Sequence, residues 1–414
     1  MKRYAQSWVL ALGLMIRIAW AIAVPVQPVS DSIAYDTLAR SLVSGSGYGF
    51  QPGDPSAYWP PGTSFVYAVL YAIFGTNYLP VVLLNLGLFL ILSAVTMSLT
   101  AQWFGRRTAI ITGILLACWP LHVQMTTILA SELLFTTLVV VAWRIWLNEQ
   151  ITLRLRTIAV GILMGGAVYV RTTALLLPGL FVWVRSIKIR KLFESAIAGL
   201  LVLIIALGLV APWSYRNYRV LGELVLVSTN GGPVFWMGNN SESTGDYMPL
   251  PPEVKGMSEV ERASYLKKLA VQHVREQPLQ FVRRSVVRLF KTHNRETIGI
   301  AWNAIALRER YGDKSLTLLK AWSQFYWIAV LGLAIIGTIR LSRQAGWLAV
   351  IAHPAVSTWS YFAGVHAVVI ANDRYHFPST PFIAMLAAYS IVGMLSHSKT
   401  GARNSEVKVL EARS

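Results

Sequence analysis

Two aspartates follow the first long apolar run, in the stretch SDSIAYDTLARSLVSGSGYGF. Asp31 and Asp36 are each able to act as a general base that takes a proton from an acceptor hydroxyl, with Asp36 as the second choice. The segment DSIAYDTLARSLV has helical spacing, and Asp31 stands at its start. Because helix-end N–H groups favour a carboxylate, a helix N-cap is the structural alternative for Asp31.

Three arginines lie beside turn-forming or polar residues and are candidates for binding a phosphate. Arg171 interrupts an apolar stretch, Arg216 belongs to PWSYRN, and Arg374 belongs to NDRYHFP. A guanidinium can form a forked pair with a phosphate, whereas anchoring to lipid headgroups is the alternative for each. Arg17, inside the first apolar run, is expected to face the interior of a helix bundle.

Polar and aromatic residues accompany these charges. The glycines and asparagines of STNGGPVFWMGNN allow tight turns that could contact a polar ligand, and Pro60-Pro61-Gly62 predicts a rigid turn. For Glu132, a structural position at a helix start is the alternative to ligand binding. The candidates for contacts with a donor or acceptor are Tyr35, Trp59, Glu132, Asn217, Asn230 and Tyr375.

The elements that must position these residues are membrane helices. Of the 414 residues, 55% are hydrophobic and 14% are charged, whereas soluble domains have about a quarter charged. The net charge of +18 could suggest nucleic acid, but the cations cluster between apolar runs, which indicates membrane topology. The single cysteine, Cys118, excludes an intrachain disulfide. The sequence therefore predicts an all-α polytopic membrane protein that binds no nucleic acid.

Ten spans are predicted from the apolar runs. Residues 63–74 are too few to cross, since a span needs about 20 apolar residues. Residues 158–183 are read as a hairpin of two short helices that turns near Arg171, because this arrangement places the basic loops and both termini in the cytoplasm. The other spans are 8–24, 79–101, 109–121, 133–147, 193–211, 322–339, 347–369 and 377–395.

These runs divide the chain into four parts. Residues 1–212 are expected to form a catalytic transmembrane module, whose first outer loop, 25–75, carries juxtamembrane helices. Residues 213–320 form a periplasmic segment, 321–396 the C-terminal transmembrane helices, and 397–414 a cytoplasmic tail. In the periplasmic segment, Ser258 and Glu261 form a capping-box pattern, and Pro278 begins a basic amphipathic stretch suited to a membrane surface.

Taken in order, these motifs resemble the membrane glycosyltransferases of the GT-C superfamily. The nearest branch, similar to glycosyltransferase family 39, holds bacterial relatives of protein O-mannosyltransferase and of the lipid A aminoarabinose transferase. The motifs are TLARSL, GYGF, WPPG, SELLF, the hairpin with Arg171, APWSYRN, STNGG with GNN, and RYHFP. Relatives often have an acidic residue after the first-loop Asp and a basic residue before PPG, where this chain has Ser32 and Trp59.

The resemblance implies transfer of a sugar from a polyprenyl-phosphate donor to a hydroxyl of a glycan, lipid or protein, with inversion. Asp31 then corresponds to the base. Arg171, Arg216 and Arg374 are expected to hold the donor phosphate, because this chain has Trp59 where relatives often have a basic residue before PPG. No metal is required, although a divalent metal is possible. The expected location is the bacterial inner membrane, with the site on the periplasmic face. A polysaccharide ligase or polymerase and a secondary transporter are the alternatives.

Overall fold

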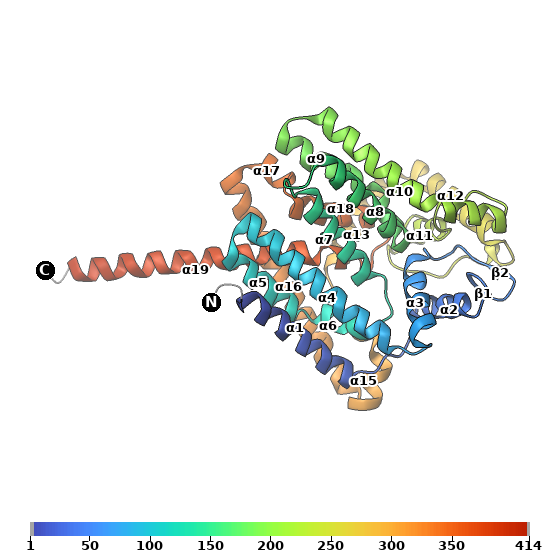
Figure 1. Ribbon diagram of the computed structural model, residues 1–414, viewed down its shortest axis with the longest axis horizontal. Helices are drawn as coiled ribbons and strands as arrows, with labels where there is room; N and C mark the ends of the chain where they lie inside the picture. The colour runs from blue at the N-terminus through green and yellow to red at the C-terminus, as the bar shows by residue number, and fades with distance from the viewer. Residues whose placement is uncertain (1–3, 412–414) are drawn as a thin grey trace.

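The computed structural model describes residues 4–411, and side chains for residues 4–396. Figure 1 shows a bundle of long helices with the start of α1 (Tyr4–Ala23) and the end of α19 (Thr380–Glu411) at one end. At the opposite end lie α2 (Asp31–Val43), α11 (Gly231–Gly238) and α12 (Glu259–Glu276). The bundle thus has two distinct ends, and the end without the termini is called the outer end here.

The first half of the chain supplies the first outer loop and the bundle helices from α4 to α10. A small antiparallel hairpin of two short strands lies in the outer loop between α2 and α3. The elements after α2 are β1 (Gly49–Gln51), β2 (Asp54–Pro55), α3 (Gly62–Phe74), α4 (Leu79–Phe104), α5 (Arg106–Cys118), α6 (Pro120–Gln124), η1 (Met125–Thr127), α7 (Glu132–Trp146), α8 (Leu153–Val170), η2 (Thr172–Leu176), α9 (Leu177–Ile189) and α10 (Leu192–Leu221).

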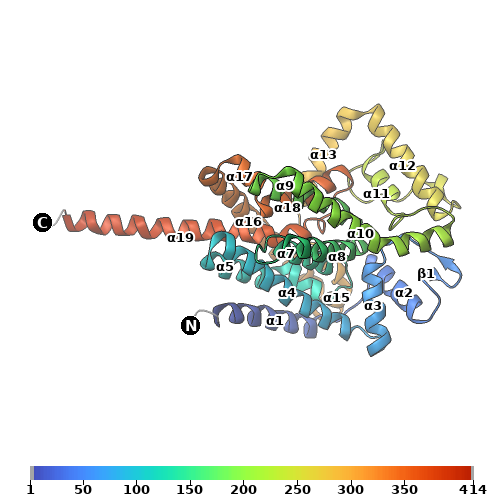
Figure 2. The same cartoon turned by 45° about the horizontal axis from the view of Figure 1, so that its top comes forward.

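The second half forms the outer segment and returns to the bundle. Figure 2 shows α11, α12 and α13 gathered together at the outer end. The remaining elements are η3 (Pro252–Val254), α13 (Pro278–His293), α14 (Ile298–Trp302), α15 (Ala304–Tyr311), α16 (Asp313–Ala345), α17 (Trp347–Ile351), α18 (Pro354–Val368) and η4 (Phe377–Ser379), which leads into α19. The expected boundaries at 212 and 320 fall inside α10 and α16, so neither marks a break in the chain. The last three residues of the expected tail, 412–414, lie outside the described residues.

In the described part of the chain, seven helices are long and apolar enough to cross a membrane, or eight if the bent pair α5 and α6–η1 is one span. The predicted count of ten is not confirmed by this measure, because α7 has 15 residues and the run 347–369 is divided at Pro354 into α17 and α18. The predicted hairpin is confirmed, with its break at Arg171. It is longer than expected, since α8 and residues 172–189 are each long enough to cross. Helix α3, with 13 residues, is too short.

Arg17 faces the bundle interior, as the sequence predicts, and it serves the broken span. Its guanidinium donates to the carbonyl oxygens of Leu116 and Ala117, both at 3.0 Å, and lies 3.4 Å from the centre of the Phe89 ring. These carbonyls lie at the end of α5, where the 54° break before α6 removes their partners within the helix. Because an unpaired carbonyl is costly in lipid, Arg17 stabilises the break.

Two charged side chains hold the first outer loop against the rest of the outer end. Arg216 in α10 donates to the carbonyl oxygens of Ser56 at 2.7 Å and Tyr48 at 2.9 Å. Glu259, the first residue of α12, accepts from Ser56 Oγ at 2.7 Å and from Thr229 Oγ1 at 2.6 Å. The predicted capping box at Ser258 is present at the start of α12. The loop that precedes Trp59 is therefore tied to two later segments of the chain.

Candidate active site

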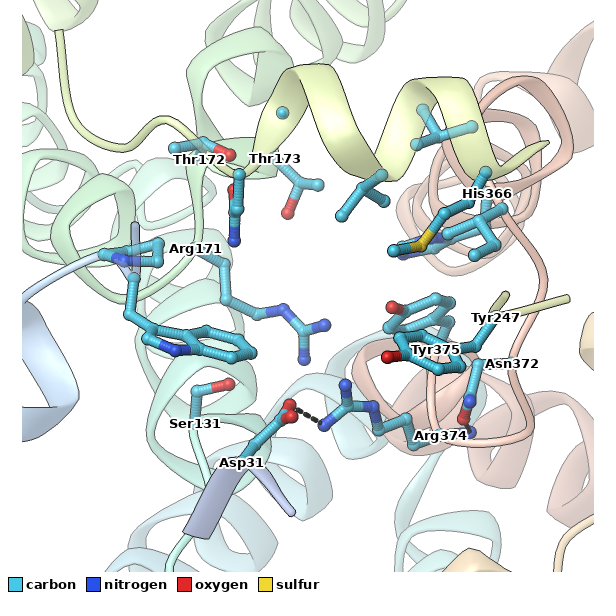
Figure 3. Close-up of a pocket in the computed structure, with 18 of the residues that line it drawn as sticks. Asp31, Ser131, Arg171, Thr172, Thr173, Tyr247, His366, Asn372, Arg374 and Tyr375 are labelled. Carbon is cyan, nitrogen blue, oxygen red and sulfur yellow. Dashed lines mark hydrogen bonds and ion pairs between the residues drawn. The ribbon is translucent and has the colours of Figure 1, made fainter. Parts of the chain in front are cut away.

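A cavity of about 680 Å³ lies where the first outer loop, the break of the hairpin, α11 and the segment before η4 converge (Figure 3). Seven of the residues singled out in the sequence line it: Asp31, Tyr35, Trp59, Arg171, Asn230, Arg374 and Tyr375. These residues come from four segments that are distant in the sequence. The cavity is therefore a product of the tertiary structure.

Four charged side chains alternate in sign along the base of the cavity. Arg171 Nη1 lies 2.9 Å from Glu132 Oε1, and Arg374 Nη1 lies 3.7 Å from the same oxygen. Arg374 Nη1 also forms an ion pair with Asp31 Oδ2 (Figure 3). Glu132 is almost fully buried, whereas the side chains of Asp31 and Arg374 are 12% and 13% exposed. The two arginines thus share one buried carboxylate, and Asp31 is the more exposed of the two carboxylates.

Asp31 is not the N-cap of its helix. Ser30 is the N-cap residue, and neither it nor Asp31 makes a side-chain capping hydrogen bond. Ser30 has a φ of 53°, a left-handed conformation that costs a residue other than glycine about 1–3 kcal/mol. Such strain is common beside functional groups, because the surrounding structure must hold it in place. The N-cap alternative is therefore wrong, and the turn at Ser30 presents the Asp31 carboxylate to the cavity.

Arg374 is positioned by aromatic rings as well as by charge. Its guanidinium lies 4.9 Å from the Trp302 ring and 5.4 Å from the Tyr375 ring. Burial by itself lowers the pKa of Arg374, but the charge of Asp31 above all raises it, and the pKa stands well above its ordinary value. Within residues 4–396, the buried Nε of Arg374 has no hydrogen-bond partner. One charged N–H of this guanidinium is therefore left without a partner among these residues.

The segment around Arg374 is held by its neighbours in the sequence. Asp373 accepts from the backbone N–H of Thr297 at 3.0 Å, and His376 Nε2 lies 3.0 Å from Glu296 Oε2. Both contacts tie the segment to the stretch that leads into α14, which carries Trp302. Burial raises the pKa of the Glu296 carboxyl. Residues of NDRYHFP thus have two different roles. Asp373 and His376 anchor the backbone of the segment, while Arg374 and Tyr375, which lie between them, face the cavity.

Aromatic rings form much of the remaining cavity wall. Tyr375 stacks on His366 with ring centres 4.1 Å apart and planes 12° apart, and Tyr35 packs against Trp59 at 5.7 Å. Burial raises the pKa of Tyr35, with help from the charges of Asp31 and Glu132, so its phenol keeps the proton. Cavities of this kind, apolar with a few placed polar groups, are typical of small-molecule sites.

Besides the buried Glu132, three candidate residues lie outside the cavity lining. Asp36 is five residues after Asp31, which turns it about 140° around the helix, and it binds Arg40 at 2.9 Å and Tyr71 Oη at 2.7 Å. Arg216 holds the outer loop as described above, and Asn217 donates to the carbonyl oxygen of Val225 at 3.0 Å. All three have structural partners instead of facing the cavity.

Other lining residues went unrecognised in the sequence. Trp302 and Ile298 come from the stretch 255–370, which carries none of the motifs that resemble the GT-C superfamily. His366 lines the cavity, where it stacks on Tyr375, and no motif singled it out. Asn372 is the first residue of NDRYHFP, two positions before Arg374, so its position was a usable signal.

The cavity residues do not suit a divalent metal ion. Among the described residues, no group of three or more His, Cys, Asp or Glu side chains gathers in a way that could hold one. The two carboxylates of the cavity, Asp31 and Glu132, are each paired with a guanidinium. The guanidinium groups of Arg171 and Arg374 already supply positive charge beside both carboxylates.

Comparisons with known proteins agree with this architecture. Residues 59–215 match the family described as dolichyl-phosphate-mannose-protein mannosyltransferase. The oligosaccharyltransferase of Archaeoglobus fulgidus in its apo form superposes with a TM-score of 0.58 at 11% identity, covering 98% of this chain and 52% of that chain. The same enzyme tethered to an acceptor peptide gives 0.56 at 12% identity, covering 96% and 50%. ArnT from Cupriavidus metallidurans gives 0.46 at 15% identity, covering 93% and 78%. No curated protein sequence matches the chain significantly.

The fold is that of a GT-C-like membrane protein, and the cavity lies at its outer end. The match of residues 59–215 to the mannosyltransferase family agrees with the resemblance seen in the ordered motifs. The matched segment contains Trp59 and Arg171 but not Asp31 or Arg374. The chain spans about half the length of the archaeal oligosaccharyltransferase, so its own activity and substrates are matters for proposal.

Proposed function

We propose that this protein is a membrane glycosyltransferase that transfers a sugar, with inversion, from a polyprenyl-phosphate donor to an acceptor hydroxyl. The acceptor is a glycan, a lipid or a protein, and the reaction takes place on the periplasmic face of a bacterial inner membrane. The single observation that carries the proposal is the cluster of Asp31, Arg374 and Arg171 in an aromatic-lined cavity of a GT-C fold. The archaeal oligosaccharyltransferase of the same fold is known in complex with a dolichol-phosphate and an inhibitory peptide.

The chemistry follows from where the charges lie. Arg374 and Arg171 bind the donor phosphate and stabilise the charge that grows on it as the bond from the sugar C1 to the phosphate oxygen breaks. Asp31 accepts the proton of the acceptor hydroxyl, whose oxygen attacks C1 from the side opposite the phosphate. The electron pair of the broken bond stays on the phosphate. Because the displacement is a single step, the configuration at C1 inverts.

The other cavity residues bind the sugar and the acceptor in this scheme. The stacked pair of Tyr375 and His366 and the Trp59 ring offer flat faces to a sugar ring. Asn230 and Tyr35 supply hydrogen bonds to hydroxyl groups. Glu132 is too deeply buried to meet a substrate, and it holds the two arginines at a fixed spacing. No observation in the described residues favours a transporter, since the charged groups gather at the outer end instead of at the middle of the spans.

The test uses the full chain in lipid nanodiscs with a panel of undecaprenyl-phosphate monosaccharides. Membranes of a strain that lacks the gene supply the acceptor, and released undecaprenyl phosphate is measured. Asp31→Asn should lower turnover at least about a hundredfold, because an amide cannot accept the proton. Asp36→Asn, the same change on the same helix but outside the cavity, should keep most of the activity. Near-normal turnover of Asp31→Asn would contradict the proposed role of Asp31.

A further inference from the structure

One of the two arginines that line the cavity is already paired with the group that must act as the base. Arg374 Nη1 pairs with Asp31 Oδ2, and both residues line the cavity (Figure 3). In this pair, Asp31 Oδ2 accepts a hydrogen bond from the guanidinium and not from an acceptor hydroxyl. A donor phosphate needs the same guanidinium. In the described structure, the base and the donor phosphate therefore compete for the same guanidinium.

We propose that the donor phosphate displaces Asp31 from Arg374, so that binding of the donor releases the base. This inference rests on the proposed function and deepens it. Donor binding and activation of the acceptor become coupled events at one guanidinium. Without donor, Asp31 stays paired and the acceptor hydroxyl finds no free base.

The two carboxylates of the cluster are held differently, and this difference decides which one moves. Glu132 is almost fully buried and lies 2.9 Å from Arg171 as well as 3.7 Å from Arg374. Asp31 lines the cavity, and among the described residues its only other hydrogen-bond partner is Ser30 Oγ at the long distance of 3.5 Å. Moving Glu132 away would leave the positive charges of Arg171 and Arg374 without a carboxylate between them. Asp31, in contrast, can turn into the cavity. Glu132 therefore stays, and Asp31 is the group exchanged.

The vacated side of Arg374 suits a phosphate. The guanidinium keeps a buried Nε that donates to no described residue, and Trp302 and Tyr375 hold its plane in place. With Asp31 gone, neighbouring N–H groups of one fork are available to two phosphate oxygens. Arg171, which faces the same cavity, adds a second cation (Figure 3).

The exchange also accounts for release of the product. In the transfer step, a bond forms between the acceptor oxygen and C1, the bond from C1 to the phosphate oxygen breaks, and the hydroxyl proton passes to Asp31. Asp31 is then neutral and does not compete for Arg374. Once it loses this proton to water, its carboxylate can pair with Arg374 again and expel the polyprenyl phosphate.

The experiment measures binding of radiolabelled undecaprenyl phosphate to the full chain in nanodiscs. Asp31→Asn should bind it at least about fivefold more tightly than the wild type, the lower end of typical coupling between linked sites, although the same variant should transfer sugar at least about a hundredfold more slowly. Asp36→Asn, whose carboxylate is paired with Arg40 and Tyr71, should bind it as the wild type does. Unchanged or weaker binding by Asp31→Asn would overturn the exchange.

A double-mutant cycle separates exchange from simple repulsion between Asp31 and the phosphate. If Asp31 competes for Arg374, the gain from Asp31→Asn should be larger in the wild type than in Arg374→Ala, where no pair has to be broken. If the two groups only repel, the gain in Arg374→Ala should be equal or larger, and the exchange is refuted. A wild-type protein that binds no undecaprenyl phosphate would refute the proposed function itself, which is a different result from binding that Asp31→Asn leaves unchanged.

Discussion

The buried pair of Glu296 and His376 offers a sharp test of how the site is held. Glu296 is fully buried, and both of its carboxylate oxygens accept from Trp119 Nε1 at 3.0 Å. His376 Nδ1 lies 2.8 Å from the carbonyl oxygen of Thr292 and Nε2 lies 3.0 Å from Glu296. Because a carbonyl oxygen only accepts, Nδ1 must carry a proton. The contact between Nε2 and the carboxyl then shares one further proton between the two groups.

Two substitutions at this pair should have very different costs. His376→Ala leaves a buried carboxylate with Trp119 as its main partner, and breaking a buried pair in this way costs about 3–5 kcal/mol. Glu296→Gln keeps the shape, since its amide oxygen accepts from Trp119 and its amide N–H donates to Nε2. That change should cost only about 1 kcal/mol, the value of one altered hydrogen bond.

Thermal unfolding in nanodiscs and binding of undecaprenyl phosphate provide the two measurements. His376→Ala should lower the unfolding temperature far more than Glu296→Gln does, and it should also weaken binding, because the anchored stretch carries Trp302 against Arg374. His273→Ala, a half-buried histidine on α12, serves as a control and should cost little. Equal losses for His376→Ala and Glu296→Gln would refute the shared-proton reasoning. A stable His376→Ala would refute the anchoring role.

Three further predictions concern the arginines and the topology. Arg374→Lys should restore little of the undecaprenyl-phosphate affinity lost in Arg374→Ala, because Lys lacks the planar fork; full affinity in Arg374→Ala would reduce this residue to a headgroup anchor. Arg17→Met should cost about 1–3 kcal/mol for each carbonyl left unpaired at the break of α5, measured by unfolding in nanodiscs, and an unchanged stability would mean that other donors serve these carbonyls. Reporter fusions after residues 105, 190 and 342 should report cytoplasm and one after 250 periplasm, and a cytoplasmic signal at 250 would overturn the topology.

Local features of this protein could be predicted from the sequence because they depend on neighbours in the chain. The turn of Pro60-Pro61-Gly62 starts α3, the pattern from Ser258 starts α12, and the polar interruption at Arg171 divides the hairpin. Apolar run length predicts the helices that are able to cross a membrane, but it also includes α7, which is too short, and the run 347–369, which is divided at Pro354. The order of the motifs predicts a GT-C-like fold, with which the structural comparison agrees.

Contacts between distant segments were decided only by the tertiary structure. A one-dimensional pattern cannot distinguish Arg374, which meets Asp31 in the cavity, from Arg216, which holds the outer loop through backbone carbonyls. The same holds for Asp31 and Asp36, whose roles separate only because the helix turns them toward different partners. Trp302 carried no signal at all, since its place under Arg374 depends on the buried anchors of its loop. A partner's identity is a property of packing, and packing joins residues whose sequence positions are unrelated.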